Sequence, residues 1–300
     1  MQKILVLDFG GQYNQLIARR VRDLHVYAEI EQFDAITPEE ISRRGYKGII
    51  FTGGPNSVYD PESPHYDPKV LELGIPVLGI CYGAQLTSWM AGGSVVTAET
   101  SEYGKIELHV KKNSSLIFTD VPADSVVWMS HTDRISDLPE GFEVTASTDN
   151  GPVAAMENAE KKLYAVQFHP EVTHSRYGNA MLKNFLYNVC ECAGDWQMDS
   201  FIEDTVAALR EQIGDKKVIL GLSGGVDSSV AAGLISRAVG DQLTCVFVDQ
   251  GLMRKDEGDF VEKTFTSLFD MHFVRVNCQQ HFLDCLKGVT DPEQKRKIIG

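Results

Sequence analysis

The sequence predicts an α/β protein of two domains, the first built on a mostly parallel mixed sheet with helices on both faces. Its 300 residues exceed what a single ordinary hydrophobic core organises. Short apolar runs of strand length alternate with segments of helical periodicity, as in parallel sheets covered by helices. The alternation restarts late in the chain, so we predict one domain over residues 1–194 and an incomplete α/β domain over residues 195–300.

The first domain begins with alternating strands and helices and ends with an antiparallel addition. Strands are predicted over 3–8, 28–32, 47–52 and 75–80, and helices over 15–24, 70–73 and 85–91. Short strands separated by turns follow over 106–110, 126–129, 142–146 and 153–156. A strand over 163–168 returns to the main sheet, and a helix over 179–190 closes the domain. Functional groups are expected at the carboxyl ends of the parallel strands.

The second domain opens with an amphipathic helix and repeats the α/β pattern. The helix covers 201–213; strands follow over 218–222, 243–248 and 272–276, with helices over 228–239 and 259–268. Three strands make a thin sheet, and residues 297–300 read as part of a continuing helix. We therefore expect the front part of a longer protein.

Composition narrows the classes of partner and compartment. A net charge of −14 argues against a nucleic-acid partner, because phosphate backbones are bound by basic surfaces. We expect no membrane association, since the sequence has neither a signal-peptide pattern nor an apolar run of bilayer length. The six cysteines show no disulfide pattern, which predicts the cytoplasm, and Cys190 and Cys192 lack the second pair that a zinc site requires.

Cys81 is the candidate nucleophile. It follows a predicted buried strand and has glycines two positions before and after it, as in G-x-S-x-G turns, where a nucleophile stands on a sharp bend. The helix predicted to start near Gln85 would point its positive end at the sulfur and favour the thiolate. A small buried core residue is the alternative interpretation of a single cysteine.

His169 and Glu171 are the candidate base and its orienting carboxylate. On a strand, residues two apart face the same side, so the two side chains could act together. A thiol, an imidazole and a carboxylate form the set used for thiolate attack on a carbonyl. We hypothesise a cysteine amidohydrolase; an ordinary polar strand end is the alternative for the pair.

Two further segments could complete this site. The Gly53-Gly54-Pro55 turn could aim a backbone N–H at a tetrahedral intermediate, and the Tyr82 amide follows the nucleophile as oxyanion-hole amides do. Ser130-His131-Thr132-Asp133 follows a predicted strand end, where it could reach a neighbouring site or form a hydrogen-bonded turn.

A separate glycine-rich loop predicts a phosphate site in the second domain. It lies between a strand and an apolar helix, and comprises Ser223, Gly224, Gly225, Val226, Asp227, Ser228 and Ser229. Glycines allow close backbone approach, hydroxyls donate, and the helix N-terminus adds partial positive charge. The loop lacks the Gly-Lys-Ser/Thr ending of a Walker A motif, and Asp227 would repel phosphate unless Mg²⁺ lay between them. The pattern predicts nucleotide plus metal.

These motifs together resemble a known family. Residues 1 to about 190 look like a class I (triad) glutamine amidotransferase domain, on Gly-Gly-Pro at 53–55, Gly-Ile-Cys-Tyr-Gly-Ala-Gln at 79–85 and Gln-Phe-His-Pro-Glu at 167–171. Ser-Gly-Gly-Val-Asp-Ser at 223–228 resembles the signature of N-type ATP pyrophosphatases, an adenine-nucleotide hydrolase-like fold. The two in this order resemble the glutamine-hydrolysing GMP synthetase family, and the similarity covers essentially the whole chain.

The resemblance implies a reaction and a role for each motif. Cys81 would attack the side-chain amide of glutamine and release ammonia, with His169 and Glu171 completing the triad, the Gly54 and Tyr82 amides holding the oxyanion and Gln85 binding glutamine. The Ser223–Ser229 loop would bind ATP with Mg²⁺ through Asp227. ATP would adenylylate xanthosine monophosphate (XMP), and ammonia would displace AMP to give GMP.

The family also sets limits on the chain. Its members continue into a C-terminal domain that binds XMP and forms a homodimer, so within this chain only Arg296 is expected near XMP. We expect these 300 residues to hydrolyse glutamine at best slowly and to make no GMP. The rival hypotheses are another triad amidotransferase that feeds an ATP-activated acceptor, and a non-catalytic module that senses glutamine or nucleotide.

Overall fold

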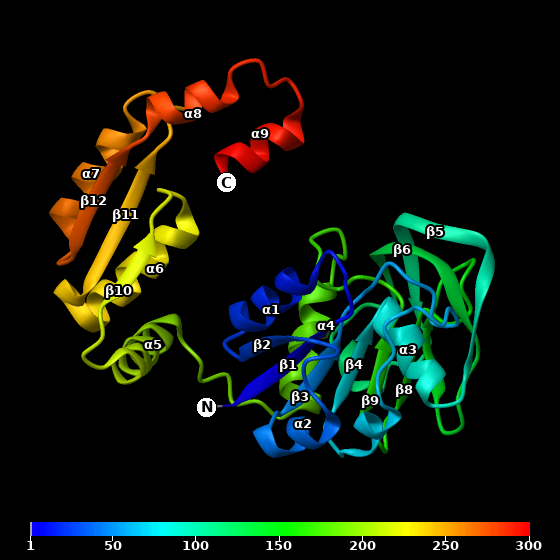
Figure 1. Cartoon of the computed structure of the whole chain (residues 1–300). Helices are drawn as coiled ribbons and strands as arrows, with labels where there is room; N and C mark the ends of the chain where they lie inside the picture. The colour runs from blue at the N-terminus through cyan, green and yellow to red at the C-terminus, as the bar shows by residue number, and fades with distance from the viewer. Residues whose placement is uncertain (1) are drawn as a thin grey trace. The chain divides into compact units, whose positions relative to one another are not determined.

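The chain folds into two compact units in the computed structural model, which describes residues 2–300 and, at Glu99, Asp199 and Ser200, only the backbone. The units are Met1–Trp196 and Gln197–Gly300 (Figure 1). The chain thus divides two residues beyond the position that the sequence predicts. Of the helices within residues 2–300, none combines the length and the apolar character needed to cross a bilayer.

A mixed nine-stranded sheet organises the described part of the first unit, in the order β2-β1-β3-β4-β9-β8-β7-β5-β6. The parallel strands are β2 (Tyr27–Gln32), β1 (Lys3–Asp8), β3 (Gly48–Phe51), β4 (Val77–Ile80) and β9 (Leu163–Val166). The antiparallel strands are β8 (Ala155–Asn158), β7 (Glu143–Ser147), β5 (Ser94–Val110) and β6 (Asp124–Asp137). The predicted α/β class, with a mostly parallel mixed sheet, is confirmed.

Helices cover both faces of this sheet because β1 alternates its side chains between two cores. Ile4 and Val6 pack with α1 (Asn14–Asp23), with α4 (Gly178–Asn184) and with the π-helical turn Phe185–Val189 that continues it. Leu5 and Leu7 pack on the other face, with α2 (Pro38–Arg44), the 3₁₀ turn Pro68–Glu72 and α3 (Tyr82–Met90). A strand buried on both faces reads as a continuous apolar run.

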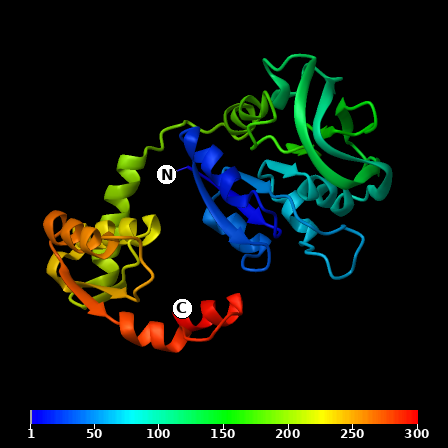
Figure 2. The ribbon, with the colours of Figure 1, turned by 90° about the horizontal axis from the view of Figure 1, so that it is seen from above.

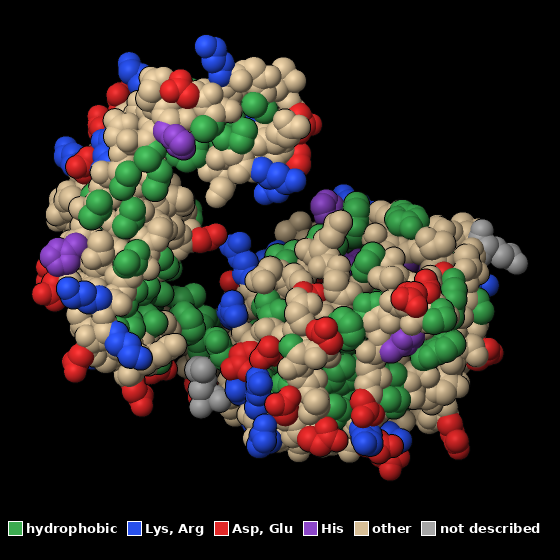
Figure 3. Space-filling model, in the orientation of Figure 1, with side chains coloured by type: hydrophobic (Ala, Val, Ile, Leu, Met, Phe, Trp, Pro, Cys, Tyr) green, Lys and Arg blue, Asp and Glu red, His purple; other side chains and the backbone are tan. Residues whose placement is uncertain are grey.

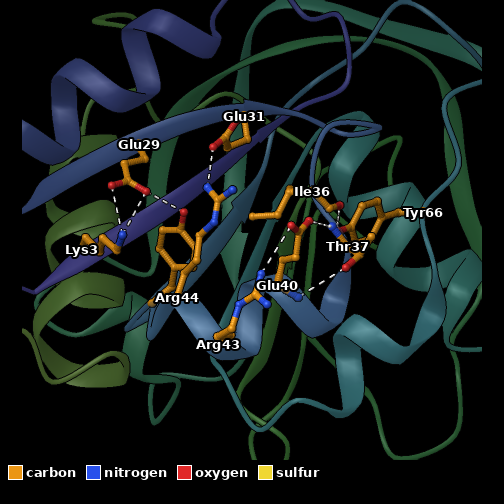
Figure 4. A network of polar contacts seen from close by, with 10 residues as sticks. Lys3, Glu29, Glu31, Ile36, Thr37, Glu40, Arg43, Arg44 and Tyr66 are labelled. Atoms are coloured by element: carbon orange, nitrogen blue, oxygen red, sulfur yellow. Dashed lines mark hydrogen bonds and ion pairs between the residues drawn. The ribbon is translucent and has the colours of Figure 1, made fainter. Parts of the chain in front are cut away.

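The sequence analysis missed helix α2, although its N-terminal signal is present. Thr37 and Glu40 form a capping box, in which each side chain accepts a hydrogen bond from the other residue's backbone N–H (Figure 4). The helix is also tied to the sheet edge, since Arg44 donates to Glu31 of β2 at 2.7 Å (Figure 4). With only two buried residues in seven, the helix has a weak hydrophobic period.

The antiparallel addition differs from the short strands that the sequence predicts. β5 and β6 are long and pair along a curved ribbon at one end of the sheet (Figure 2), and the 3₁₀ turn Leu116–Phe118 lies between them in the chain. Ser130–Asp133 lies inside β6, so both the predicted strand end and the turn alternative are wrong. The pairing of β5 with β6 is interrupted between Thr97 and Glu102. β6 itself alternates without a break, but its buried positions His131 and Asp133 are polar, which hides the strand from a sequence reading.

The second unit holds a three-stranded parallel sheet, β10 (Val218–Gly221), β11 (Leu243–Asp249) and β12 (His272–Asn277). Its helices are α5 (Met198–Ile213), α6 (Val226–Val239), the 3₁₀ turn Gly240–Gln242, α7 (Glu257–Leu268), α8 (Gln279–Leu286) and α9 (Pro292–Ile299). Residues of α6 and α7 cover one sheet face in a small core. On the other face Ile219 is 77% exposed and Val274 is 43% exposed.

Charged side chains of both signs are interspersed on the face seen in Figure 3. Among the coloured side chains of that face, Lys and Arg do not merge into an extended basic surface on either unit. Hydrophobic side chains reach the surface of the second unit in the same view, in keeping with the exposed Ile219, Val230 and Phe260.

Candidate active site

The candidate site lies at the carboxyl ends of four neighbouring parallel strands, β1, β3, β4 and β9. The strand order reverses at β1, which lies between β2 and β3. Ligands of open α/β sheets bind at such a switch point, because the loops on either side diverge and leave a crevice. A cavity at this place is lined by residues from these loops and from α3, β5 and β6: Gly10–Tyr13, Gly53–Ser57, Cys81, Tyr82, Gln85, Tyr103, Ser130–Asp133 and His169.

Cys81 stands on a sharp turn between β4 and α3. Its φ is +53° and its ψ is −107°, a conformation that L-residues rarely adopt. The glycines on either side permit this turn, because a Cβ on Gly79 would lie 2.4 Å from the Gly83 carbonyl oxygen and one on Gly83 would lie 2.4 Å from that of Phe51. Helix α3 begins at Tyr82, nearer to the thiol than predicted, so its positive end lies beside the sulfur.

His169 and Glu171 meet beyond the end of β9. His169 Nδ1 lies 2.7 Å from Glu171 Oε1, and the Glu171 side chain is fully buried. β9 ends at Val166, so strand alternation is the wrong reason for their pairing. The turn is instead fastened by tertiary contacts: His169 N–H donates to Trp128 O at 3.0 Å, and Arg20 Nε donates to Glu171 O at 3.0 Å.

The electrostatics of this pair favour a protonated imidazole. Burial of the ring opposes protonation, but hydrogen bonding to Cys81 and to the Glu171 carboxylate outweighs it and raises the pKa of His169 to about 10. A thiol, a proton-carrying imidazole and a buried carboxylate are thus held in one cluster. Such a set can add a sulfur to a carbonyl carbon and protonate the group that leaves.

The wall of the cavity is a polar network centred on Asp133. Gln85 Nε2 donates to the Asp133 carbonyl oxygen at 2.9 Å, and the Ser57 and Tyr59 hydroxyls donate to its carboxylate. Among the described residues that line the cavity, Asp133 supplies the only carboxylate. A substrate with an ammonium group can therefore be oriented at Asp133.

Sequence reasoning missed two other contributors to the cavity. The ring edge of Tyr13 packs against His169, with ring centroids 5.1 Å apart. Asp8 at the end of β1 accepts hydrogen bonds from Gly10 N–H and Asn14 Nδ2, which fixes the loop that carries Tyr13. These contacts join loops that are distant in sequence, and the only local signal is the pair of glycines at 10–11.

The candidate oxyanion donors are close neighbours beside Cys81, since a Cβ on Gly54 would lie 3.1 Å from the Tyr82 ring. Gly54 follows β3 and Tyr82 is the first residue of α3, and both line the cavity. The first N–H groups of a helix have no partner within the helix. The Tyr82 amide therefore has no partner within α3, and Gly54 borders the same cavity.

The phosphate-loop candidates gather at the carboxyl end of β10. Gly225 N–H donates to the Ser223 hydroxyl at 3.2 Å, while the Ser228 and Ser229 hydroxyls donate to Gly225 O. Helix α6 begins at Val226, two residues earlier than predicted, so Val226 and Asp227 belong to its first turn. Asp227 is exposed, and no three metal-ligating side chains gather among those that the structure describes. One exposed carboxylate beside a helix N-terminus fits a Mg²⁺ whose other ligands are phosphate oxygens and water.

The remaining predicted positions neither line the Cys81 cavity nor belong to the Ser223–Ser229 loop. Arg296 lies on α9, where it pairs with Glu293 and keeps a side chain 71% exposed. Cys190 and Cys192 are buried in the core of the first unit, and burial raises the pKa of both thiols.

Comparison with known proteins shows where this arrangement occurs. The family model for class-I glutamine amidotransferases matches residues 5–189, and the model described as NAD synthase matches residues 197–283. The chain is 60% identical, over all of its length, to the GMP synthase [glutamine-hydrolyzing] of Ruminiclostridium cellulolyticum. It is 59% identical, over 99% of its length, to the enzyme of that name from Clostridium botulinum. The chain spans 58% of the length of each of these relatives.

A solved structure extends the match to the fold. A protein of Thermoplasma acidophilum, described as one subunit of a GMP synthase, superimposes with a TM-score of 0.56 and is 32% identical. The match covers 68% of this chain and 98% of that one. Since the family model also spans more than half of the residues, the chain belongs to the class-I glutamine amidotransferase family.

Proposed function

We propose that this chain carries the glutamine-hydrolysing part and the beginning of the ATP-dependent part of a GMP synthase. The positive φ of Cys81, beside the His169–Glu171 pair, carries the proposal for the first unit. The strand–glycine loop–helix arrangement at Ser223–Ser229 supports the second. The names of the relatives at 59–60% identity support the choice of product.

Hydrolysis would proceed through a thioester. The Cys81 sulfur attacks the side-chain amide carbon of glutamine, and the carbonyl electrons move to the oxygen, which the Gly54 and Tyr82 amides receive. His169 gives its proton to the amide nitrogen, the C–N bond breaks and ammonia leaves. Water then attacks the thioester carbon while His169 takes its proton, the C–S bond breaks, and His169 passes that proton to the sulfur, so that glutamate departs and the thiol returns.

Each supporting side chain has a distinct task in this scheme. Glu171 holds the His169 ring in orientation and stabilises its charged form, in line with the raised pKa of His169. Asp133 would receive the α-ammonium of glutamine, and Gln85 would hold the wall to which that carboxylate belongs. The bulk of the rate gain would come from the oxyanion donors and the oriented nucleophile.

In the second unit, the Ser223–Ser229 loop would bind the β- and γ-phosphates of ATP through backbone N–H groups and hydroxyls. Bound Mg²⁺ would neutralise phosphate charge, and Asp227 is the residue that we propose to hold it. Transfer of AMP to the 2-oxygen of XMP turns that oxygen into a leaving group, which ammonia displaces to give GMP. Adenylylation releases pyrophosphate rather than ADP.

We further propose that XMP recognition and homodimer formation belong to the part of the relatives that this chain does not span, with Arg296 near XMP. We propose a reducing compartment such as the cytoplasm, because a catalytic thiol must stay unoxidised.

The direct test of the first unit is replacement of its nucleophile. Cys81→Ala is expected to lower glutamine hydrolysis by this chain at least ~1,000-fold, about 4 kcal/mol in the barrier, since no other group replaces the sulfur. Cys285→Ala, at an exposed cysteine of the second unit, serves as the matched control and should leave the rate unchanged. Equal activity of the two variants would overturn the assignment of Cys81. For the whole reaction, XMP-dependent release of AMP and pyrophosphate with ammonium as nitrogen source should survive Cys81→Ala in the longer protein.

A further inference from the structure

A second histidine–carboxylate pair, Glu102 with His131, lies buried in the wall of the cavity, which His131 itself lines. His131 Nε2 lies 3.3 Å from Glu102 Oε2, and each side chain is 4% exposed. The two residues are direct cross-strand partners on β5 and β6. The hydrolysis scheme above gives neither of them a task.

The carboxylate of this pair is held in its charged form. Burial alone would raise the pKa of Glu102, but His131 and Thr148 outweigh that effect and lower it. The Thr148 hydroxyl donates to Glu102 Oε1 at 2.6 Å and in turn accepts the Gly151 N–H at 2.8 Å. Neither ring nitrogen of His131 has a hydrogen-bond partner among the described residues, so its 3.3 Å approach to Glu102 is an electrostatic contact and the Thr148 hydroxyl supplies the hydrogen bond. A buried charge is tolerated only with such partners, so separating the two strands would leave the carboxylate uncompensated.

The position of the pair in the ribbon gives it a particular importance. Thr97 pairs with Asp133 and Glu102 pairs with His131, so residues 98–101 of β5 stand opposite Thr132 alone. Backbone pairing is therefore interrupted beside the cavity wall. Glu102 and His131 are the first pair after this interruption, where a cross-strand side-chain contact can hold the register.

The residues next to His131 on β6 touch both working parts of the cavity. Ser130 O lies 3.8 Å from Cys81 Sγ, and Asp133 O accepts the 2.9 Å hydrogen bond from Gln85. Asp133 also carries the carboxylate that faces the cavity. A shift of this segment by a fraction of an ångström would displace the contacts of substrate and thiol together.

We propose that Glu102 and His131 are positioning residues for glutamine hydrolysis, which lock segment Ser130–Asp133 against Cys81 and Gln85. The inference rests on the proposed glutaminase function. Neither side chain touches the reacting atoms; the pair acts through the strand that carries the cavity wall.

The test compares two Glu→Gln substitutions on the same strand. Glu102→Gln keeps the shape but removes the charge at the pair, whereas Glu107→Gln removes an exposed charge five residues further along β5. We expect Glu102→Gln to raise the KM for glutamine about tenfold while kcat falls less than about threefold, because the substrate wall loosens more than the nucleophile. Thr148→Val, which keeps the charge but removes one hydrogen bond to it, should raise KM by a smaller factor.

Binding is followed without turnover by protection of Cys81 from iodoacetamide with L-glutamate, which has the backbone groups of glutamine. The half-protecting concentration should rise about tenfold in Glu102→Gln and stay constant in Glu107→Gln. If Glu102→Gln and Glu107→Gln had the same KM and the same half-protecting concentration while the wild type was active and protected, the positioning role would be overturned and the proposed function would stand. If Glu102→Gln lowered kcat by as large a factor as it raised KM, and also lowered the thermal stability, the pair would have a merely structural role. A wild type that neither hydrolyses glutamine nor is protected would remove the proposed function itself.

Discussion

Two strand-to-helix turns, one in each unit, carry the residues on which the proposed function depends, and they are built in opposite ways. After β4 the backbone of Cys81 is forced to a positive φ by buried neighbours on every side. After β10 the loop from Ser223 to Gly225 is largely exposed, and its hydroxyls bond to one another and to Gly225 O. The first turn is set by packing before any substrate arrives, whereas the second has hydroxyls that can exchange their partners for phosphate oxygens.

The comparison extends to the glycine two residues before each turn. Gly79 in β4 has backbone atoms of Gly83 and Ala84 within 3 Å of the place where a Cβ would stand. Gly221 in β10 holds the corresponding place before Ser223, and nothing lies within 4 Å of its added Cβ. One turn therefore depends on the absence of a side chain, and the other does not.

The largest expected difference follows from this contrast. Gly79→Ala should lower the free energy of unfolding of the first unit by about 3 kcal/mol, since backbone atoms cannot move aside as a side-chain end would. Gly221→Ala, the matched control, should change the stability of the second unit by less than about 0.5 kcal/mol. Urea unfolding measured by hydrogen exchange in each unit tests both. A tolerated Gly79→Ala would show that the Cys81 turn is not imposed by packing.

The second expected effect concerns the charge behind His169. Glu171→Gln should lower kcat/KM for glutamine about 100-fold, about 2.7 kcal/mol, because the imidazolium loses its buried counter-charge. Glu157→Gln is the control, since Glu157 is equally buried but is hydrogen-bonded to Lys112 and Ser115 outside the cavity. If both variants hydrolyse glutamine at the same rate, Glu171 has no special part in the reaction.

The smallest effect is a difference between the units in pH dependence. The pKa of His169 is raised above 6.5, so this residue stabilises the folded first unit. Its contribution to the free energy of unfolding is complete below pH 6.5 and is lost as the pH rises through about 10. Hydrogen bonding to Arg275 lowers the pKa of Asp249. The contribution of Asp249 to the free energy of unfolding of the second unit is therefore present above pH 3.8 and is lost as the pH falls below that value.

These opposite directions can be separated by a single probe. The three tryptophans, Trp89, Trp128 and Trp196, all lie in the first unit, so their fluorescence follows its unfolding. The unfolding midpoint seen by tryptophan should fall between about pH 7 and about pH 10, and His169→Gln should flatten that decline. Unfolding of the second unit is followed by circular dichroism, because tryptophan fluorescence does not report it. Asp249→Asn should make the midpoint of that unfolding less sensitive to acid. An unchanged alkaline decline in His169→Gln would contradict the raised pKa.

The parts of the molecule that local sequence determines are the parts that could be predicted. The alternating strands indicated the fold class, and the glycines around Cys81 indicated the turn because each acts within a few residues of the thiol. The pairing of His169 with Glu171 was predicted for the wrong reason, since tertiary contacts to Trp128 and Arg20, rather than a strand, hold the turn.

The remainder required long-range contacts that no local pattern reveals. β6 alternates exposed and buried positions through Ser130–Asp133, but its buried positions there are the polar His131 and Asp133, so the apolar alternation that marks a strand stops at Met129. Tyr13 reaches His169 from a loop far earlier in the chain, and Ser57 and Tyr59 reach Asp133 across the cavity. Helix α2 was missed although Thr37 and Glu40 stand three apart, because its apolar positions are too few to mark a helix.

The positive φ of Cys81 also restricts which nucleophiles this scaffold can carry. A serine fits the same backbone, since it branches no more at Cβ than cysteine does. Threonine is excluded, because a β-branched side chain at φ near +53° meets its own backbone. Evolution or design starting from this turn can therefore exchange sulfur for a primary hydroxyl, but cannot arrive at the threonine chemistry that other hydrolases use.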